Sequence, residues 1–183
     1  LLPRSRLGVV RGITKVYISI MRGTPLMLQI IVIYLGPGLM GFASPWGSST
    51  NGRLLAAVVA FVINYAAYFA EIFRSGIQSI PAGQYEAAKV LGYTGGQTFL
   101  RIILPQVVKR VLLPVANEVI TLIKDTALAS TVAVVDLMTV AKKQVSSSSS
   151  IEPYVVAIVL YLVLNGVAEQ LCKLAERKMS YYR

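Results

Sequence analysis

The sequence predicts an all-α protein whose helices cross a membrane several times, and two observations support this fold class. Of the 183 residues, 55% are hydrophobic and only 14% are charged, with a mean hydropathy of +0.65. About a quarter of the residues are charged in an ordinary soluble domain. The apolar residues also gather into long runs, and about 20 apolar residues cross a hydrocarbon core. We therefore expect residues 1–183 to form a single transmembrane domain.

Four apolar runs are predicted to be membrane spans. Thr24 to Ala43 and Leu54 to Ala70 contain no charged residue. The third run extends from Val107 to about Val135 and is unusual because Pro114 and several charged residues interrupt it. The fourth run extends from Pro153 to Ala168. The sequence thus predicts a four-helix transmembrane bundle.

The boundaries of these spans are predicted from turn and capping residues. Thr24 is expected to cap a helix that begins at Pro25, because proline is favoured at the first helical position. The five serines from Ser146 to Ser150 are expected to form a solvated loop.

Charge asymmetry predicts the orientation in the membrane. Most of the 18 Lys and Arg residues lie in Leu1–Gly23, in Arg74–Arg110 or in the tail from Glu169. Four spans place these three regions on the same side, and an excess of basic residues is typical of cytoplasmic loops. We expect a multi-pass protein of the bacterial cytoplasmic (inner) membrane.

Composition also argues against other classes of protein. A net charge of +10 could indicate a nucleic-acid partner, but the basic residues flank apolar runs and do not form a basic patch interleaved with aromatic residues. The chain has one cysteine, Cys172, and no histidine, so neither a disulfide within the chain nor a His-based metal site is expected. We predict no nucleic-acid partner, no metal site and no cofactor bound by this chain.

The loop at 79–105 carries the most specific motif. Pro81 is predicted to open a short helix, and Gly92 is predicted to end it in the left-handed conformation that glycine tolerates. A Gly-rich turn and a second short helix ending at Pro105 are expected to follow. No Gly-rich run in the sequence ends in Gly-Lys-Ser/Thr, so nucleotide binding by this chain is not predicted.

This loop resembles the EAA loop of permease subunits in binding-protein-dependent ABC importers. The residues that carry the resemblance are Glu86, Ala87, Ala88, Gly92, Leu104 and Pro105. Two further segments resemble the polar amino-acid branch of that family, namely Arg22–Leu26 and Lys124–Ala129.

The resemblance implies the fold of a type I ABC importer, in which the loop docks on a cytoplasmic ATPase subunit. It implies two ATP-binding cassette subunits as partners, which bind and hydrolyse ATP with Mg, so that this chain is a transport subunit and not an enzyme. It also implies a second, identical permease subunit, an extracytoplasmic amino-acid-binding protein and a lipid environment. Such permeases commonly have five spans, so a fifth, N-terminal span is expected to be missing here.

Acidic residues in the third apolar run suggest the substrate. Glu118, Thr121 and Asp125 are spaced three and four apart, which places them on one face of a helix. Carboxylates are costly in a bilayer, so this face is expected to line the translocation pathway, with Asn117 in an adjoining stripe. Alternatively, Asp125 and Lys124 lie at the outer interface and hold helices together. A cationic amino acid such as arginine, lysine or histidine is favoured over glutamine or another polar solute.

Polar residues in the first two runs are also candidates for substrate binding. Gln29 and Asn64 are predicted either to line the pathway or to join helices by hydrogen bonds. Glu71 is expected to pair with Arg74, one turn further along the helix.

Two alternatives come from other classes of protein. An ion channel would need a selectivity filter and would not use the loop at 79–105. An intramembrane enzyme would need histidine or paired catalytic groups at one depth, which the sequence does not provide.

Overall fold

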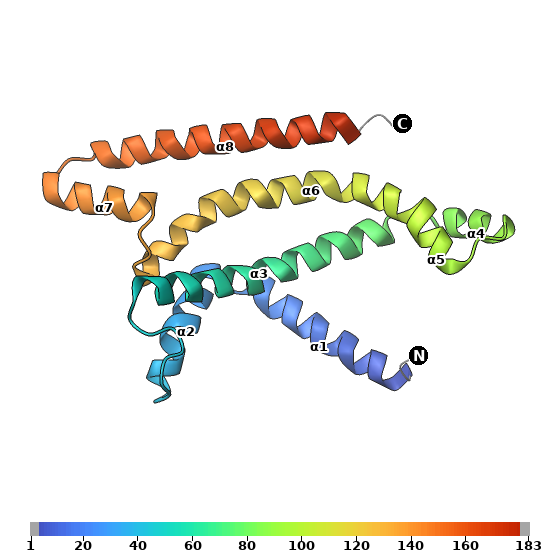
Figure 1. The fold of residues 1–183 in the computed structure, drawn as a ribbon, viewed down its shortest axis with the longest axis horizontal. Coiled ribbons are helices and arrows are strands. Elements are labelled where there is room, and N and C mark those ends of the chain that lie inside the picture. Colours follow the sequence, from blue (N-terminus) through green and yellow to red (C-terminus); the bar gives the residue numbers. More distant parts are fainter. Residues whose placement is uncertain (1–3, 180–183) are drawn as a thin grey trace. The chain divides into compact units, whose positions relative to one another are not determined.

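The computed structural model describes residues 4–179 as a succession of helices joined by short turns (Figure 1). The elements are α1 (Arg4–Gly23), α2 (Leu26–Leu39), α3 (Thr50–Gln78), α4 (Ala82–Val90), α5 (Gly95–Thr98), the π-helix η1 (Phe99–Ile103), α6 (Leu104–Asp125), the 3₁₀ helix η2 (Thr126–Val132), α7 (Leu137–Ser148) and α8 (Glu152–Met179). No strand occurs within residues 4–179, and the predicted all-α fold class is confirmed.

The chain divides into two compact units. Unit 1 comprises Leu1–Tyr68 and Lys124–Leu162, and unit 2 comprises Phe69–Ile123 and Val163–Arg183. Each unit has its own apolar core, and the two are described separately below.

Length and composition identify fewer spans than the four predicted. Among the described residues, two helical segments are long and apolar enough to cross a membrane, Thr50–Gln78 and Glu152–Arg177. A third crossing exists if Gly8–Gly23 and Leu26–Leu39, which meet at an angle of 106°, form one broken span. α6 does not meet the same criterion because charged residues are scattered along it.

The predicted third span differs from the structure at its C-terminal end. The α-helix ends at Asp125, and the chain continues as the narrower 3₁₀ helix η2 before Ala133 adopts a left-handed conformation with φ 58°. η2 packs against α2, where the tighter winding of a 3₁₀ helix and its small alanine side chains allow a close approach.

Unit 1 is organised around two prolines that remove backbone donors from helices. Pro37 lies inside α2 and has no N–H for the carbonyl of Ile33, four residues earlier. The indole nitrogen of Trp46 donates to that carbonyl at 2.7 Å and replaces the missing hydrogen bond. Trp46 therefore fastens the loop after α2 to the helix itself.

The sharp bend between α1 and α2 occurs at Thr24 and Pro25. Thr24 does not cap α2, so that prediction is wrong: its hydroxyl donates back to the carbonyl of Ile20 at 2.8 Å. A threonine hydroxyl can satisfy a carbonyl at the end of a preceding helix as readily as it caps the next one. Pro25 itself occupies the N-cap position of α2.

The core of unit 1 lies between α2, α3 and η2. Ile30 of α2 is fully buried against Ala57 and Ala60 of α3 and against Ala129 and Val132 of η2. The small side chains of α3 let its neighbours approach closely, as is typical of helix contacts in membrane proteins.

The serine run is largely helical, and the predicted loop is wrong for its first three residues. α7 extends to Ser148, and the chain turns at Ser149 with φ 51°. The hydroxyls of Ser146, Ser147 and Ser148 donate to main-chain carbonyls three or four residues earlier, at 2.8 to 3.0 Å. This local bonding keeps the polar segment helical.

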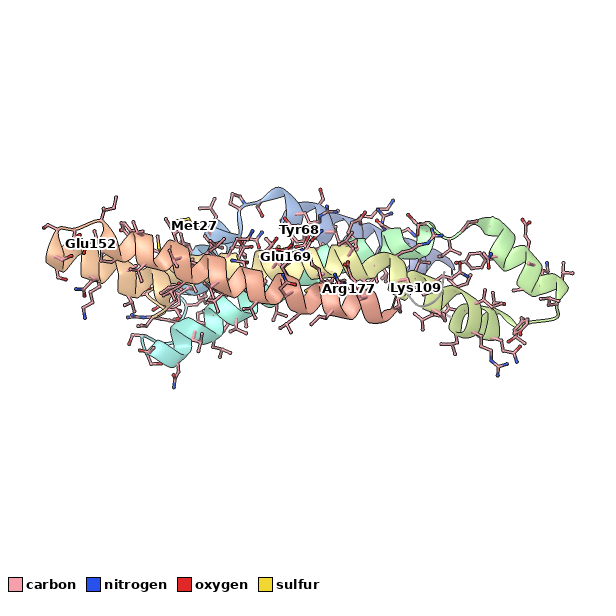
Figure 2. The ribbon with its side chains drawn as sticks, turned by 90° about the horizontal axis from the view of Figure 1, so that it is seen from above. Met27, Tyr68, Lys109, Glu152, Glu169 and Arg177 are labelled. Atoms are coloured by element: carbon pink, nitrogen blue, oxygen red, sulfur yellow. The ribbon has the colours of Figure 1, made fainter. Side chains whose placement is uncertain are left out.

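α8 is a long helix with little packing along its length. Glu152, Glu169 and Arg177 mark its course in Figure 2. In the part that belongs to unit 1, Val155, Ile158 and Leu162 are each more than half exposed. Such an apolar surface is suited to contact with lipid or protein.

In unit 2, the core joins the end of α3 to the start of α6. Ile80, Ile103, Val107 and Val111 are buried together. The two helices approach closely at Gly76, where an added Cβ would lie 2.3 Å from Cγ1 of Val111 and 3.4 Å from Cγ1 of Val107. Glycine is required here because valine is branched at Cβ and moves aside only with difficulty.

We expect Gly76→Ala to destabilise the protein, although alanine is the better helix former. Overpacking typically costs about 1–3 kcal/mol, so the unfolding midpoint in detergent should fall by several degrees. Adding Val111→Ala should recover at least half of the loss, because it removes the methyl group that clashes. Gly166→Ala is the matched control, since a Cβ at Gly166 of α8 meets no atom within 4 Å. An unchanged midpoint in Gly76→Ala would contradict the close approach.

Candidate functional site

The loop between α3 and α6 presents a short helix with two distinct faces. α4 begins after Pro81, whose fixed φ of −58° favours helix initiation. Ala88 is 1% exposed and packs inward. Glu86 and Val90, spaced four apart, are exposed on the opposite face, where Val90 is 87% exposed.

The end of α4 is a Schellman motif, which confirms the predicted left-handed end of this helix at Gly92. Gly92 has φ +78°, its N–H donates to the carbonyl of Lys89 at 3.1 Å, and the N–H of Tyr93 donates to the carbonyl of Ala88 at 3.0 Å. These two hydrogen bonds satisfy carbonyls that would otherwise have no partner at the helix end. A side chain at position 92 would be strained in this conformation.

A capping box starts the next helix. The hydroxyl of Thr94 accepts from the N–H of Gln97, and the side chain of Gln97 accepts from the N–H of Thr94. The reversal between α4 and α5 is therefore built from local hydrogen bonds at both ends.

The second short helix does not end at Pro105, so that prediction is wrong. α5 leads into the π-helical turn η1 and then directly into α6, with Leu104 and Pro105 in its first turn. Proline is tolerated there because the first turn of a helix leaves N–H groups unpaired, and the wide turn of η1 precedes it.

Several contacts attach the loop to the rest of unit 2. Ile80 and Ile103 are buried in the same core. The guanidinium of Arg110 donates to the carbonyl of Ser79, and the side-chain amide of Gln106 donates to that of Gln84 at 3.2 Å. These contacts hold the loop against the end of α3 and the start of α6.

The six residues of the predicted coupling motif differ in their exposure to solvent. Glu86, Ala87, Gly92 and Pro105 are exposed, Leu104 is half-buried and Ala88 is buried. Ala88 therefore packs inside the loop and is not on its exposed surface. Val90 was not among the residues predicted from the sequence, although its spacing of four from Glu86 places it on the same face.

Asn64 and Gln29 lie together in unit 1 at the bend between α1 and α2. The carbonyl of Met21 has lost its helical donor because the residue four positions later is Pro25. The side-chain amides of Asn64 and Gln29 both donate to this carbonyl at 3.0 Å, and the amide of Asn64 also donates to the side-chain oxygen of Gln29 at 3.0 Å. These amides thus have main-chain partners at the bend.

Asp125 also has a partner in unit 1. One carboxylate oxygen accepts a hydrogen bond from the hydroxyl of Tyr65 at 2.8 Å. The ring of Tyr65 lies near those of Phe61 and Tyr68, with centroids 6.3 and 6.1 Å away. Asp125 is thereby held to α3 at the point where α6 changes to η2.

The other candidates for substrate binding lie on α6 in unit 2. Glu118 is half-buried, whereas Asn117 and Thr121 are exposed. The hydroxyl of Thr121 donates to the carbonyl of Asn117 at 2.9 Å, within the same helix.

The predicted ion pair of Glu71 and Arg74 near the end of α3 is confirmed. Nε of Arg74 donates to the carboxylate of Glu71 at 3.0 Å.

Comparison with known proteins gives consistent matches over nearly the whole chain. Residues 2–181 match the family described as the binding-protein-dependent transport system inner membrane component. The chain is 36% identical to the nopaline transport system permease protein NocM of Agrobacterium fabrum, over 96% of this chain and 75% of that protein. It is 37% identical to the arginine transport system permease protein ArtQ of Bacillus subtilis, over 91% of this chain and 74% of that protein.

Two solved structures share the fold. A crystal structure of an amino acid ABC transporter with histidines superposes with a TM-score of 0.79 at 36% identity, over 90% of this chain and 74% of the other. The MetNI methionine ABC transporter in an inward-facing conformation superposes with a TM-score of 0.74 at 18% identity, over 96% and 77%, and this second likeness concerns the fold alone. With its helical fold and the loop described above, this chain belongs to the family of binding-protein-dependent transport system inner membrane components.

Proposed function

We propose that this chain is the transmembrane subunit of an ATP-driven amino-acid importer in the bacterial cytoplasmic membrane. In this proposal it forms the translocation pathway with a second, identical permease subunit. Two cytoplasmic ATP-binding cassette subunits hydrolyse ATP, and an extracytoplasmic binding protein delivers the amino acid. Support comes from the family, whose name specifies binding-protein-dependent transport, and from relatives named for nopaline, arginine and L-cystine transport.

The observation that carries the proposal is the exposed face of α4. Val90 and Leu91 are 87% and 73% exposed in a loop that lies outside both long apolar helices, and Glu86 is exposed beside Val90. Exposed apolar side chains gathered in this way are typical of a surface that binds another protein. We infer that Glu86 and Val90 contact the ATPase subunit, while Ala88 and the Gly92 turn hold the helix in position.

Coupling through α4 can be tested by changing its exposed face. In the reconstituted complex, Glu86→Arg and Val90→Asp should each reduce substrate-stimulated ATP hydrolysis by about tenfold or more, since a central contact is worth about 2 kcal/mol. Gly92→Val should act similarly by straining the left-handed turn. The measurements are ATPase activity and the amount of ATPase subunit that copurifies.

Matched variants separate lost contact from lost folding. Val90→Ile keeps the apolar character and Glu86→Gln keeps the shape, so Val90→Ile should retain activity and Glu86→Gln should lose less than Glu86→Arg. All variants should insert in the membrane at wild-type levels. Normal stimulated hydrolysis in both Glu86→Arg and Val90→Asp would rule out this face as the coupling surface.

The proposed orientation places the loop at 79–105 in the cytoplasm and the end of α7 outside. In a Cys172→Ser background, a cysteine at Ser148 should react with an impermeant thiol reagent added to intact cells, because Ser148 is exposed. A cysteine at Lys89, which is exposed on α4, should react only after the cells are opened. The opposite labelling pattern would invert the topology.

A cationic amino acid is the substrate that we propose. Glu118 is half-buried in a helix that also carries Asn117 and Thr121, and a carboxylate at bilayer depth is stabilised by a cationic group. We propose that Asp125 also contacts the substrate, because its spacing along the chain from Glu118 and Thr121 would place it on the same helix face. Asn64 and Gln29 are weaker candidates, because their amides already bond to the main chain at the bend.

Glu118→Gln tests the substrate proposal, since it keeps the shape of the side chain and removes its charge. Uptake of arginine should fall by well over tenfold, because one charge-assisted hydrogen bond is worth about 1.5–3 kcal/mol. Uptake into proteoliposomes gives the measurement, and Glu152→Gln, at an exposed position at the start of α8, is the control. Wild-type arginine uptake by Glu118→Gln, or preference of the wild type for glutamine, would refute the cationic selector.

A further inference from the structure

The first helix carries a straight stripe of basic residues. Arg4, Arg11, Lys15 and Arg22 recur at intervals of seven, four and seven. At 100° per residue these positions fall within an arc of about 40°, whereas Arg6 falls outside this arc, at a position beside that of Ile13. Arg11, Lys15 and Arg22 are exposed, and no acidic residue occurs from Leu1 to Gly23.

An apolar stripe lies on the opposite side of the same helix. Its members also share an exposed arc, and they are Val9 (62% exposed), Ile13 (64%), Val16 (59%) and Ile20 (51%). Apolar side chains of this kind contribute favourable free energy only when their surface is removed from water. The helix is therefore strongly amphipathic, with its apolar side uncovered.

The C-terminal half of α1 contacts α3 through Tyr17 and through Arg22, the last residue of the basic stripe. The hydroxyl of Tyr17 donates to the carbonyl of Ile63, and the guanidinium of Arg22 lies 5.3 Å from the centre of the Tyr68 ring. Ile63 and Tyr68 belong to the last two turns of the uncharged run that ends at Ala70, just before Glu71. The C-terminal end of α1 thus meets α3 where its apolar run gives way to charge.

We propose that α1 lies along the cytoplasmic surface of the bilayer, with its apolar stripe among the acyl chains and its basic stripe on anionic phospholipid headgroups. Helices with a basic face, an opposite apolar face and low overall hydrophobicity occupy this position. Charge complementarity selects the occupant, because a stripe without acidic residues attracts the negative surface of the cytoplasmic leaflet. The bend of 106° then directs α2, which has no charged residue, away from the surface.

The competing arrangement makes α1 the inner half of a broken span. It would carry Arg11 and Lys15 into the hydrocarbon, where charged side chains are costly unless they face protein or water. The two arrangements predict different depths for the apolar stripe. In a surface helix its four residues share one depth, whereas in a half-span the depth increases from Val9 to Ile20 by up to about 16 Å, at 1.5 Å per residue.

A depth profile distinguishes these arrangements. Single cysteines at Val9, Ile13, Val16 and Ile20 in a Cys172→Ser background would be spin-labelled in the full complex, reconstituted in equal parts of phosphatidylcholine and phosphatidylglycerol. Accessibility to oxygen and to a water-soluble nickel complex reports the depth of each label. We expect one shallow depth for all four labels and aqueous exposure for a label at Gly12, which lies outside the apolar arc. A steady increase in depth from Val9 to Ile20, or aqueous exposure of all four, would overturn the proposal.

The lipid requirement has its own comparison. In phosphatidylcholine alone, or in an Arg11→Gln/Lys15→Gln variant, accessibility of the Ile13 label to the nickel complex should rise several-fold, because two electrostatic contacts are lost. Arg22 is left unchanged because it contacts Tyr68. Equal accessibility in both lipid mixtures would exclude anionic lipid as the occupant, and accessibility that depends on protein concentration would assign the stripe to a second copy of the chain.

The inference rests on the proposed function for one point only, the cytoplasmic side of the loop at 79–105. Arginine uptake by the wild-type complex tests that function independently. A complex without uptake but with the expected depth profile would reject the transport proposal and retain the surface helix. A complex with normal uptake, in which label depth increases from Val9 to Ile20, would retain the transport proposal and reject the surface helix.

Discussion

Main-chain carbonyls that have lost a helical donor are costly in apolar surroundings, and unit 1 is built to avoid that cost. Pro25 and Pro37 each remove an N–H from the position where a helix would need it. Side chains distant in the sequence supply the missing donors, since Asn64 reaches Met21 and Trp46 reaches Ile33. The bond from Asn64 joins α3 to the end of α1. The bond from Trp46 joins the loop between α2 and α3 to α2.

In the loop of unit 2, the main-chain groups at the helix ends find hydrogen-bond partners among neighbouring residues. The Schellman motif at Gly92 and the capping box from Thr94 to Gln97 satisfy the helix ends within a few residues. The turn between α4 and α5 is thus set by local hydrogen bonds, and Glu86 and Val90 stay exposed beside it. Packing of Ile80 and Ile103 connects that shape to the two long helices.

Several parts of the fold could be predicted from the sequence alone. The all-α fold class follows from composition and the uncharged runs, and the left-handed turn at Gly92 follows from glycine at a helix end. The pair of Glu71 and Arg74 follows from helical spacing. The motif around Glu86 also indicated the family to which the chain belongs.

Other features depended on contacts between distant residues, which periodicity does not contain. The sequence permitted Thr24 to cap the next helix, but its hydroxyl bonds back to Ile20. The motif treated Ala87 and Ala88 alike, whereas packing buries Ala88 and leaves Ala87 and Val90 exposed.

What the sequence by itself determined is the class of fold, the turn at Gly92 and the pair of Glu71 and Arg74, because these depend on composition or on residues close together in the chain. Only the tertiary structure decided that Asn64 and Gln29 serve a proline-broken helix and that Gly76 must lack a side chain. Each of these two features depends on which helix packs against the residue concerned. The packing of helices is decided by contacts across the whole unit and not by neighbouring residues.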